Sequence, residues 1–472
     1  MDISEEDYKL AKEAHVSDCT GGSIHEINLV CASIVSAHML WTSLVQANII
    51  CQDSFAPEFI IYVLPVLSCL TIASDYAAYV TVAMATVALF IFSSKKPTTT
   101  AAAADANHNE TKQAEHKSYL TVYRAGTMIL TCIAILAVDF QFFPRRFAKV
   151  ETFGTSLMDV GVGSFVFSSG VVASRAYIHP QQQQQNRAFI KSFIKSIRSA
   201  LPILVLGFAR FFLTKSVNYQ EHNSEYGLHW NFFFTLGFLP PFVTTLSFLR
   251  RFASFSVLAT VIAIGYQTAL CQGLQDWILK APRVDMISAN KEGICSFAGY
   301  LSIFMFGLEC GSIIFQNDLS TTRISRLFGI AQQKQTKQLA VHLFTFSALM
   351  WSGFGLWISL FPEFYVSRRM ANLPYIFWVI AFNLTLLSCL VLVESKSQIR
   401  GGGRGPPMLD AVNINGLITF LLANVLTGTV NLSIRTLYAN DLQSSFINAA
   451  YMLIVTAVPW IMWRSFKIRI KF

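Results

Sequence analysis

Residues 139–175 read DFQFFPRRFAKVETFGTSLMDVGVGSFVFSSGVVASR and join two long apolar segments. Asp139 ends the first segment, and Asp159 opens a glycine-rich run that leads to Arg175. A proline and four ionisable side chains lie in the connection: Pro144, Arg145, Arg146, Lys149 and Glu151. A simple turn at a membrane surface needs fewer charges. We therefore expect this connection to carry chemistry as well as to join two spans.

The composition of the whole chain indicates a membrane protein. Of the 472 residues, 53% are hydrophobic and 13% are charged, whereas soluble proteins average about 25% charged residues. A helix needs about 20 mostly apolar residues to cross a bilayer. Helices are the expected form because backbone polar groups must be satisfied inside lipid. The sequence therefore predicts an all-α, polytopic membrane protein that forms one domain over residues 1–472.

Thirteen runs are long and apolar enough to be membrane spans. We predict spans at 26–46, 56–74, 76–94, 119–139, 158–175, 194–214, 229–248, 254–273, 294–315, 339–361, 373–393, 411–432 and 445–464. The odd number places the termini on opposite sides of the membrane. With a lumenal N-terminus and a cytosolic C-terminus, Lys and Arg are in excess in the cytosolic connections, as the positive-inside rule requires.

Most of the charge in the connections between spans has an ordinary explanation. Residues 94–118 are polar and rich in Ala and Thr, which predicts a flexible cytosolic loop. The net charge of +9 comes from basic residues in short connections, where they set topology, so we expect no nucleic-acid partner. The nine cysteines are scattered and form no CxxC or Cys/His cluster, so we expect no metal site.

Asp139 and Lys149 are the sharpest candidates for chemistry. Pro144 interrupts any continuous helix between them, so the connection can fold Lys149 back toward the end of the span at Asp139. A carboxylate at a partly dry boundary can act as a general base on a hydroxyl. A nearby lysine can hold it ionised, stabilise the oxyanion of acyl transfer or bind a phosphate. The spacing also fits an interfacial ion pair that only ends a helix, and it does not decide between the two.

A second polar stretch, KSVNYQEHNSEYGLHW at 215–230, falls on the same predicted side as Lys149. Glu221 and His222 suit recognition of sugar hydroxyls or an amine, and Tyr226 or Trp230 is suited to stacking on a sugar ring. A solvated loop with an aromatic belt at the interface explains the same residues.

Small and polar residues inside spans have structural interpretations too. Gly161, Gly163, Ser164 and Gly170 allow either tight helix packing or a groove for an acyl chain. Polar side chains in the span at 411–432, among them Asn431, are more typical of contacts between helices than of a site.

Five segments together resemble the GPI inositol acyltransferase family, which includes PIG-W of animals and its fungal counterparts. They are TGGSIHEINLV (20–30), the stretch at 139–175, RFFLTKSVNYQEHNSEYGLHWNFFFTL (210–236), NKEGICSFAGYLSIFMFGLECG (290–311) and the span at 413–432. The resemblance follows the chain in order over essentially its full length.

The resemblance implies an enzyme of the endoplasmic reticulum membrane. It would transfer a fatty acyl chain, typically palmitoyl, from acyl-CoA to the inositol 2-hydroxyl of glucosaminyl-phosphatidylinositol. Acyl-CoA is then a co-substrate, membrane lipids surround the protein, and no cofactor is implied. The family's catalytic Asp and Lys resemble Asp139 and Lys149 in placement. We add as expected substrate-binding residues Arg145, Arg146, Asp159, His222 and Glu225.

Other functions remain open on the residues alone. Thirteen spans with intramembrane charges also fit a lipid or solute transporter, or a membrane scaffold without enzymatic activity. A histidine-based membrane-bound O-acyltransferase would place a key histidine within a span; only His38 lies well inside one, without polar neighbours in sequence.

Overall fold

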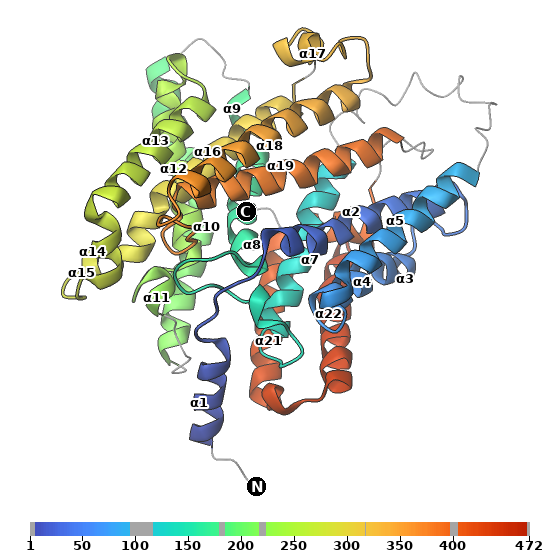
Figure 1. Cartoon of the computed structure of the whole chain (residues 1–472), viewed down its shortest axis with the longest axis horizontal. Helices are drawn as coiled ribbons and strands as arrows, with labels where there is room; N and C mark the ends of the chain where they lie inside the picture. The colour runs from blue at the N-terminus through green and yellow to red at the C-terminus, as the bar shows by residue number, and fades with distance from the viewer. Residues whose placement is uncertain are drawn as a thin grey trace.

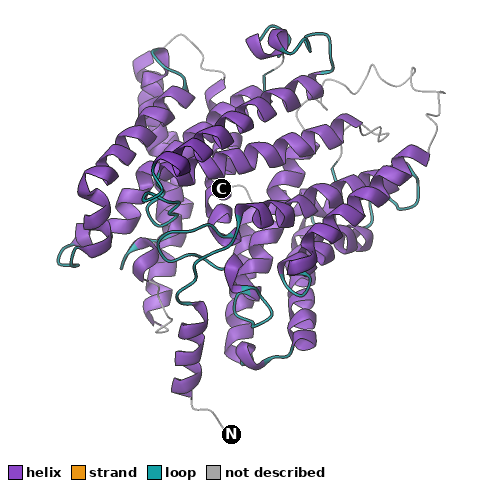
Figure 2. Ribbon diagram, in the orientation of Figure 1, coloured by secondary structure: helices purple, strands orange, loops and turns teal. Residues whose placement is uncertain are grey.

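The computed structural model of the chain describes residues 5–94, 117–178, 185–216, 223–316, 318–396 and 405–469. These residues form helices and connections, and no strand occurs among them (Figure 2). The predicted loop at 94–118 lies outside the described residues except for its two ends, and so does His222. The all-α fold class is confirmed.

The helices follow one another along the chain, and the connections between them differ in length. Their bounds are α1 (Glu5–Val16), α2 (Ile24–Gln46), α3 (Phe55–Glu58), η1 (Phe59–Val63), α4 (Leu64–Leu70), η2 (Ser74–Tyr76), α5 (Ala77–Ser94), α7 (Ser118–Ala137), η3 (Arg145–Phe147), α8 (Leu157–Ala173), α9 (Arg175–Ile178), α10 (Gln185–Ser216), α11 (Asn223–Tyr226), α12 (Phe232–Leu246), η4 (Ser247–Arg251), α13 (Phe255–Ala269), η5 (Leu270–Leu274), α14 (Gln275–Lys280), α15 (Met286–Ala289), α16 (Lys291–Ile314), α17 (Arg323–Leu327), α18 (Gln335–Leu360), α19 (Leu373–Lys396), α20 (Pro407–Ile414), α21 (Gly416–Ser433), η6 (Thr436–Tyr438) and α22 (Asp441–Arg464).

The structure supports twelve of the thirteen predicted spans. Within the described residues, 12 helical segments are long and apolar enough to cross a membrane, and Phe55–Leu70 is a shorter apolar helix that matches the remaining predicted span. The predicted span at 411–432 differs in detail. The helix is interrupted at Asn415, whose backbone leaves the helical region, so α20 and α21 are separate helices.

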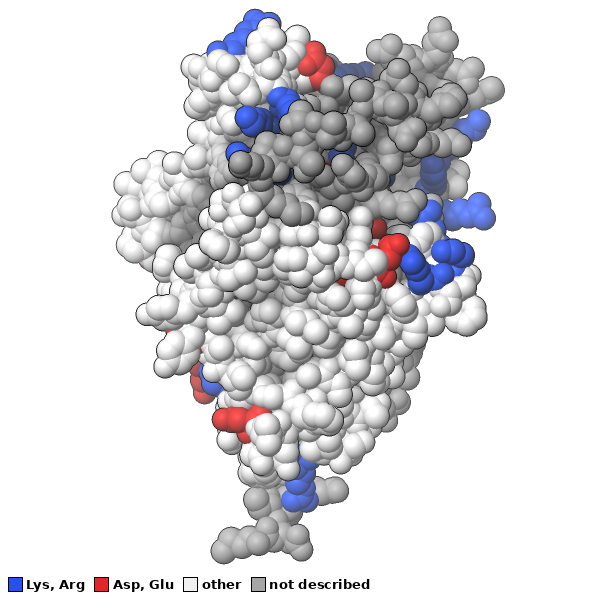
Figure 3. Space-filling view, turned by 90° about the vertical axis from the view of Figure 1, so that its right-hand side faces the viewer, with Lys and Arg blue, Asp and Glu red and all other residues white. Residues whose placement is uncertain are grey.

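Burial separates the central helices from the peripheral ones. The most apolar windows of α7 and α19 are 78% buried, whereas those of α10 and α21 are 17% buried. Figure 1 shows α7 and α8 in the middle of the molecule, with α10 to α15 on one side and α2 to α5 on the other. In Figure 3 a broad central area carries no charged side chain, which is the kind of surface that lipid covers.

The α8–α16 contact depends on small residues. A Cβ atom on Gly170 would lie 2.2 Å from the carbonyl oxygen of Phe304, and one on Gly307 would lie 2.3 Å from the carbonyl oxygen of Phe167. Only glycine permits backbones to approach this closely. Of the two roles considered for the small residues, tight packing is therefore the one that the structure shows at Gly170.

Several connections meet at one end of the helices. Contacts join α1 to the 138–156 connection and to η6, and join that connection to α11 and to residues 361–372. The predicted topology placed all of these segments on one side of the membrane, and their contacts agree with it. The assignment of that side to the lumen stays a prediction.

Candidate functional site

The 138–156 connection is anchored by aromatic side chains. α7 ends at Ala137, and Pro144, with φ −61°, leads into the short 3-10 turn η3. Phe140, Phe143 and Phe147 have no exposed surface. Their burial fixes the path of the connection, while the charged residues between them stay at the surface of the helical bundle.

Asp159 fastens the other end of the connection. Its Oδ2 accepts hydrogen bonds from Ser156 Oγ at 2.8 Å and from the Val150 amide at 3.1 Å. Ser156 in turn caps α8 by accepting a bond from the Asp159 amide. The carboxylate therefore binds both the residue after Lys149 and the start of α8, and it fixes where Lys149 leaves the chain.

Asp139 lies where three distant segments meet. Its Oδ1 is 3.4 Å from Lys12 Nζ of α1, and its Oδ2 accepts a hydrogen bond of 2.7 Å from Asn431 Nδ2 of α21. Lys12 also donates to Asn431 Oδ1 at 2.7 Å. With 8% of its surface exposed, Asp139 is buried but lies at the end of its span. The three groups form a closed, mutually bonded set.

Lys149 belongs to a different set, a chain of alternating charges. Its Nζ lies 2.8 Å from Glu225 Oε1, and Arg368 Nη1 lies 3.0 Å from the same oxygen. Arg368 Nε then lies 2.6 Å from Asp159 Oδ1. The Arg368 side chain is 4% exposed, while that of Lys149 is 42% exposed. The chain therefore begins in the interior and ends at an accessible ammonium group.

Opposite charges stabilise one another within this chain. Burial alone would raise the pKa of Glu225, but the charges of Lys149 and Arg368 lower it to about 2. Burial alone would lower the pKa of Arg368, but Glu225 and Asp159 raise it well above its ordinary value. Each carboxylate stabilises the neighbouring cation, and each cation stabilises the carboxylate.

The two predicted catalytic residues are thus close in sequence but have separate partners. Among the contacts of the described residues, Asp139 binds Lys12 and Asn431, and Lys149 binds Glu225. Three of the predicted residues are brought together: Lys149 and Glu225 touch directly, and Arg368 links Glu225 to Asp159.

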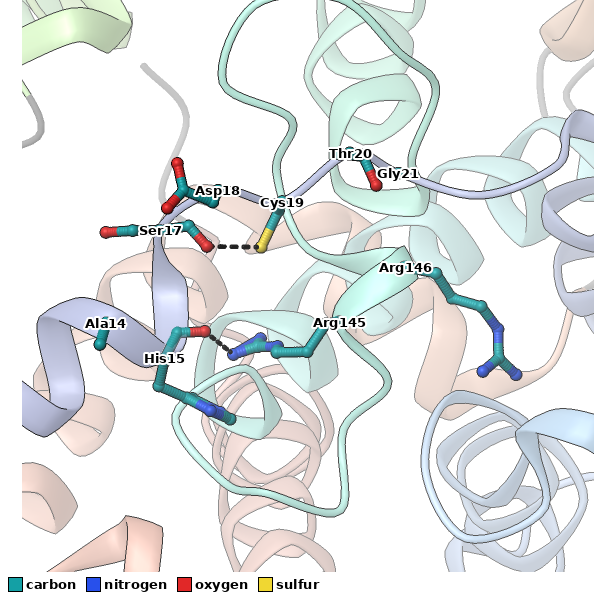
Figure 4. A pocket seen from close by; sticks show the side chains of 9 residues that line it. All are labelled: Ala14, His15, Ser17, Asp18, Cys19, Thr20, Gly21, Arg145 and Arg146. Atoms are coloured by element: carbon teal, nitrogen blue, oxygen red, sulfur yellow. Dashed lines mark hydrogen bonds between the residues drawn. The ribbon is translucent and has the colours of Figure 1, made fainter.

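Arg145 and Arg146 point in opposite directions (Figure 4). Arg145 Nη1 donates to the His15 carbonyl at 2.8 Å, and Nη1 and Nη2 both donate to the Val138 carbonyl. Arg146 forms ion pairs with Glu26 and Asp75 instead. The charge of Arg146 is therefore compensated by carboxylates, whereas Arg145 is bonded to neutral carbonyl groups.

Sequence reasoning missed two residues of the site and interpreted a third differently. Lys12 lies in a polar N-terminal stretch that gives no local signal, and Arg368 lies in a connection between spans where a basic residue is ordinary. Asn431 was interpreted as a contact between helices, and it does join α21 to the end of α7, but through Asp139. Within the described residues, no group of three His, Cys, Asp or Glu side chains could hold a metal ion.

A protein-family model described as GWT1 matches residues 8–462. The chain belongs to the GWT1 family. This match includes every site residue described above, and it confirms at the level of the family the resemblance drawn from the sequence.

Fungal members of the GWT1 family are similar to this chain over nearly all of its length. A protein of Yarrowia lipolytica is 39% identical, covering 98% of this chain and 99% of its own. Proteins of Saccharomyces cerevisiae and Candida albicans are each 36% identical, covering 97% and 94% of this chain and 98% and 95% of their own. All three are named GPI-anchored wall transfer protein 1.

Proposed function

We propose that this protein is an acyl-CoA-dependent O-acyltransferase of GPI-anchor biosynthesis in the endoplasmic reticulum membrane. It transfers a fatty acyl chain, such as palmitoyl, to the inositol 2-hydroxyl of glucosaminyl-phosphatidylinositol. The observation that carries the proposal is the buried carboxylate of Asp139, held by Lys12 and Asn431 at the end of its span, in a chain whose relatives are named GPI-anchored wall transfer protein 1.

Asp139 is the proposed general base. Its two oxygens are oriented by Lys12 and Asn431, and a carboxylate oxygen with one hydrogen bond still has acceptor capacity. Asp139 takes the proton of the inositol 2-hydroxyl while the hydroxyl oxygen attacks the thioester carbonyl. The new C–O ester bond forms, the C–S bond breaks, and the proton leaves on the thiol of CoA.

Lys149 is the proposed oxyanion-stabilising group. Its ammonium is accessible, and its position is set by Glu225 and Arg368. A fixed positive charge that faces the tetrahedral intermediate lowers the barrier without reorganisation at the moment of reaction. The balanced chain behind Lys149 supplies this fixed position.

The donor and acceptor of this reaction are the proposed partners. CoA phosphates suit the basic residues at the opposite end of the helices. There Arg175, Arg250 and Arg251 each stack over an aromatic ring. The acceptor head group suits the polar residues near Asp139, among them Arg145, Arg146 and Glu225; Asp159 serves by positioning.

The test is acyl transfer in microsomes that express the full chain. We expect Asp139→Ala and Lys149→Ala to reduce the rate by about 10²–10⁴-fold at normal abundance, the range for loss of a general acid or base. Matched controls are Asp441→Ala and Lys280→Ala, which remove exposed charges on the same side of the molecule. Near-normal rates from both site variants would exclude the mechanism. Lipid movement without acyl-CoA-dependent modification of inositol would indicate a transporter instead.

A further inference from the structure

A polar cleft opens beside the proposed general base. It has a volume of about 370 Å³ and is lined by residues 14–21 on one side and by Arg145 and Arg146 on the other (Figure 4). The first wall is the end of α1 and the turn that follows it, and the second is η3 in the 138–156 connection. The cleft therefore lies between the segment that supplies Lys12 and the connection that follows Asp139.

Arg145 brings a positive charge to this cleft. Its guanidinium donates to the carbonyl groups of His15 and Val138, and among the described residues the Asp139 carboxylate acts on its charge without forming an ion pair with it. Its Nε is buried and has no hydrogen-bond partner in the described structure. A guanidinium group binds phosphate through two parallel N–H···O hydrogen bonds. Because the Nε–H group of Arg145 has no acceptor in the described structure, a phosphate oxygen is a suitable partner for this side chain.

His15 adds a second unsatisfied group to the same wall. Its Nε2 is also buried without a partner among the described residues. Burial and the nearby charge of Arg145 lower the pKa of His15, which favours the neutral ring. Buried polar atoms without partners are uncommon and costly. Both residues also line the cleft, so a polar ligand that entered it would lie beside them.

The rim of the cleft carries the opposite charge. Asp18 is exposed and has a positive φ of 56°, a backbone conformation that few residues other than Gly, Asn and Asp adopt. The cleft thus presents a cation on its inner wall and a carboxylate at its edge. This pattern is complementary to a ligand with one anionic and one cationic group.

We propose that this cleft binds the head group of the acyl acceptor, with Arg145 on the phosphodiester and Asp18 on the ammonium group of the amino sugar. The assignment rests on the proposed function. In a 1-phosphoinositide, the phosphodiester is on the ring carbon next to the one that carries the 2-hydroxyl, so the phosphate-binding group must lie close to the general base. Arg145 meets this requirement because it is bonded to the carbonyl of Val138, the residue before Asp139.

A neighbouring cleft provides a matched control. It has a volume of about 430 Å³ and is lined mainly by apolar side chains of residues 434–447 together with Arg435. Arg435 lies over the ring of Tyr8, with its guanidinium carbon 5.8 Å from the ring centre. The Arg435→Gln variant therefore removes a positive charge from the same end of the molecule without altering the polar cleft.

The experiment measures binding without acyl transfer. The purified full-length protein is titrated in detergent with glycerophosphoinositol and with myo-inositol, and the thermal midpoint is followed. We expect the phosphodiester to stabilise the wild type more than inositol does. Its apparent affinity should fall at least tenfold in Arg145→Gln, less in Arg145→Lys, and not in Arg435→Gln. Equal effects of the Arg145 and Arg435 substitutions would overturn the assignment.

A second arm tests the amine. Deacylated glucosaminyl-phosphoinositol should bind more tightly than its N-acetylated form, and Asp18→Asn should abolish the difference. Asp18 is exposed, so this variant tests the cleft even if the Arg145 substitutions prevent folding. A difference that survives in Asp18→Asn would contradict the assignment of the amine to Asp18.

Different results would contradict the proposed cleft and the proposed reaction. Arg145-dependent binding of the phosphodiester without acyl transfer would support the cleft and exclude the reaction. Acyl transfer with an unchanged KM for the acceptor in both Arg145 variants would support the reaction and exclude the cleft.

Discussion

Asp139 and Lys149 are joined by one short connection, yet they occupy two different electrostatic environments. Asp139 is held by one ammonium and one amide, from α1 and α21. Lys149 ends a chain of two cations and two carboxylates that extends into the interior. The first set has one cation and one carboxylate, and its cation comes from a partly exposed helix. The second is a longer chain that is buried at Arg368 and exposed at Lys149.

The difference separates two physical tasks. A general base has to exchange a proton with substrate, so it benefits from partners that orient it and leave acceptor capacity. An oxyanion-stabilising cation has to stay charged and in place, so it benefits from buried partners whose protonation does not change. The buried side chains of Phe140, Phe143 and Phe147 fix the path of the connection, and so the separation between Asp139 and Lys149.

The largest expected effect comes from the interior of the charge chain. Arg368→Met leaves Asp159 and Glu225 facing each other without the cation between them. We expect a loss of about 3–5 kcal/mol of stability, the cost of breaking a buried pair by removing one partner. Thermal unfolding of the purified protein in detergent measures this loss. Lys12→Met, which removes the cation beside Asp139 but leaves the hydrogen bond from Asn431, should cost less, about 1.5–3 kcal/mol. Similar losses from the two variants would contradict the distinction between the two environments.

The next effect tests whether the chain positions Lys149. Glu225→Gln keeps the size of the side chain but removes the charge that holds the ammonium. We expect kcat for acyl transfer to fall roughly 10- to 100-fold with KM for acyl-CoA unchanged, because small misplacements of a catalytic group have costs of this order. Glu225→Asp should restore part of the rate. A normal kcat in Glu225→Gln would show that Lys149 needs no such support.

A smaller effect is expected on the Asp139 side. Lys12→Met should lower kcat about tenfold, since a hydrogen bond involving a charged group contributes about 1.5–3 kcal/mol. The control is Lys9→Met, on the same helix, at an exposed position. If both variants have the same rate, α1 does not contribute to the site through Lys12.

The smallest effect concerns pH. The folded-state pKa of Glu225, about 2, is below its ordinary value of 4.5. The stability that its charge contributes is therefore fully present above about pH 4.5 and is lost as the pH falls toward 2. We expect the difference in thermal midpoint between wild type and Glu225→Gln to be constant from pH 8 to 5 and to shrink below pH 4.5. A difference that changed between pH 8 and 6 would point to another titrating group.

The sequence was a reliable guide to the spans and a partial guide to the site. All thirteen predicted spans have a helical counterpart, although one counterpart is short and another is divided at Asn415. Asp139, Lys149, Asp159 and Glu225 all lie at the end of the bundle where the connections meet. The pairing of Asp139 with Lys149, suggested by their spacing, is replaced in the structure by separate partners.

The sequence by itself determined the features that depend only on residues close together in the chain. The length and apolarity of each run decide whether a helix can lie in lipid, and Pro144 interrupts the helix whatever surrounds it. The partners of the charged groups were decided only by the tertiary structure. Asn431 and Asp139 are 292 residues apart, and Arg368 and Asp159 are 209 apart. Such contacts follow from how the helices pack, which includes approaches as close as that of Gly170 to Phe304. No pattern of residues close together in the chain specifies them.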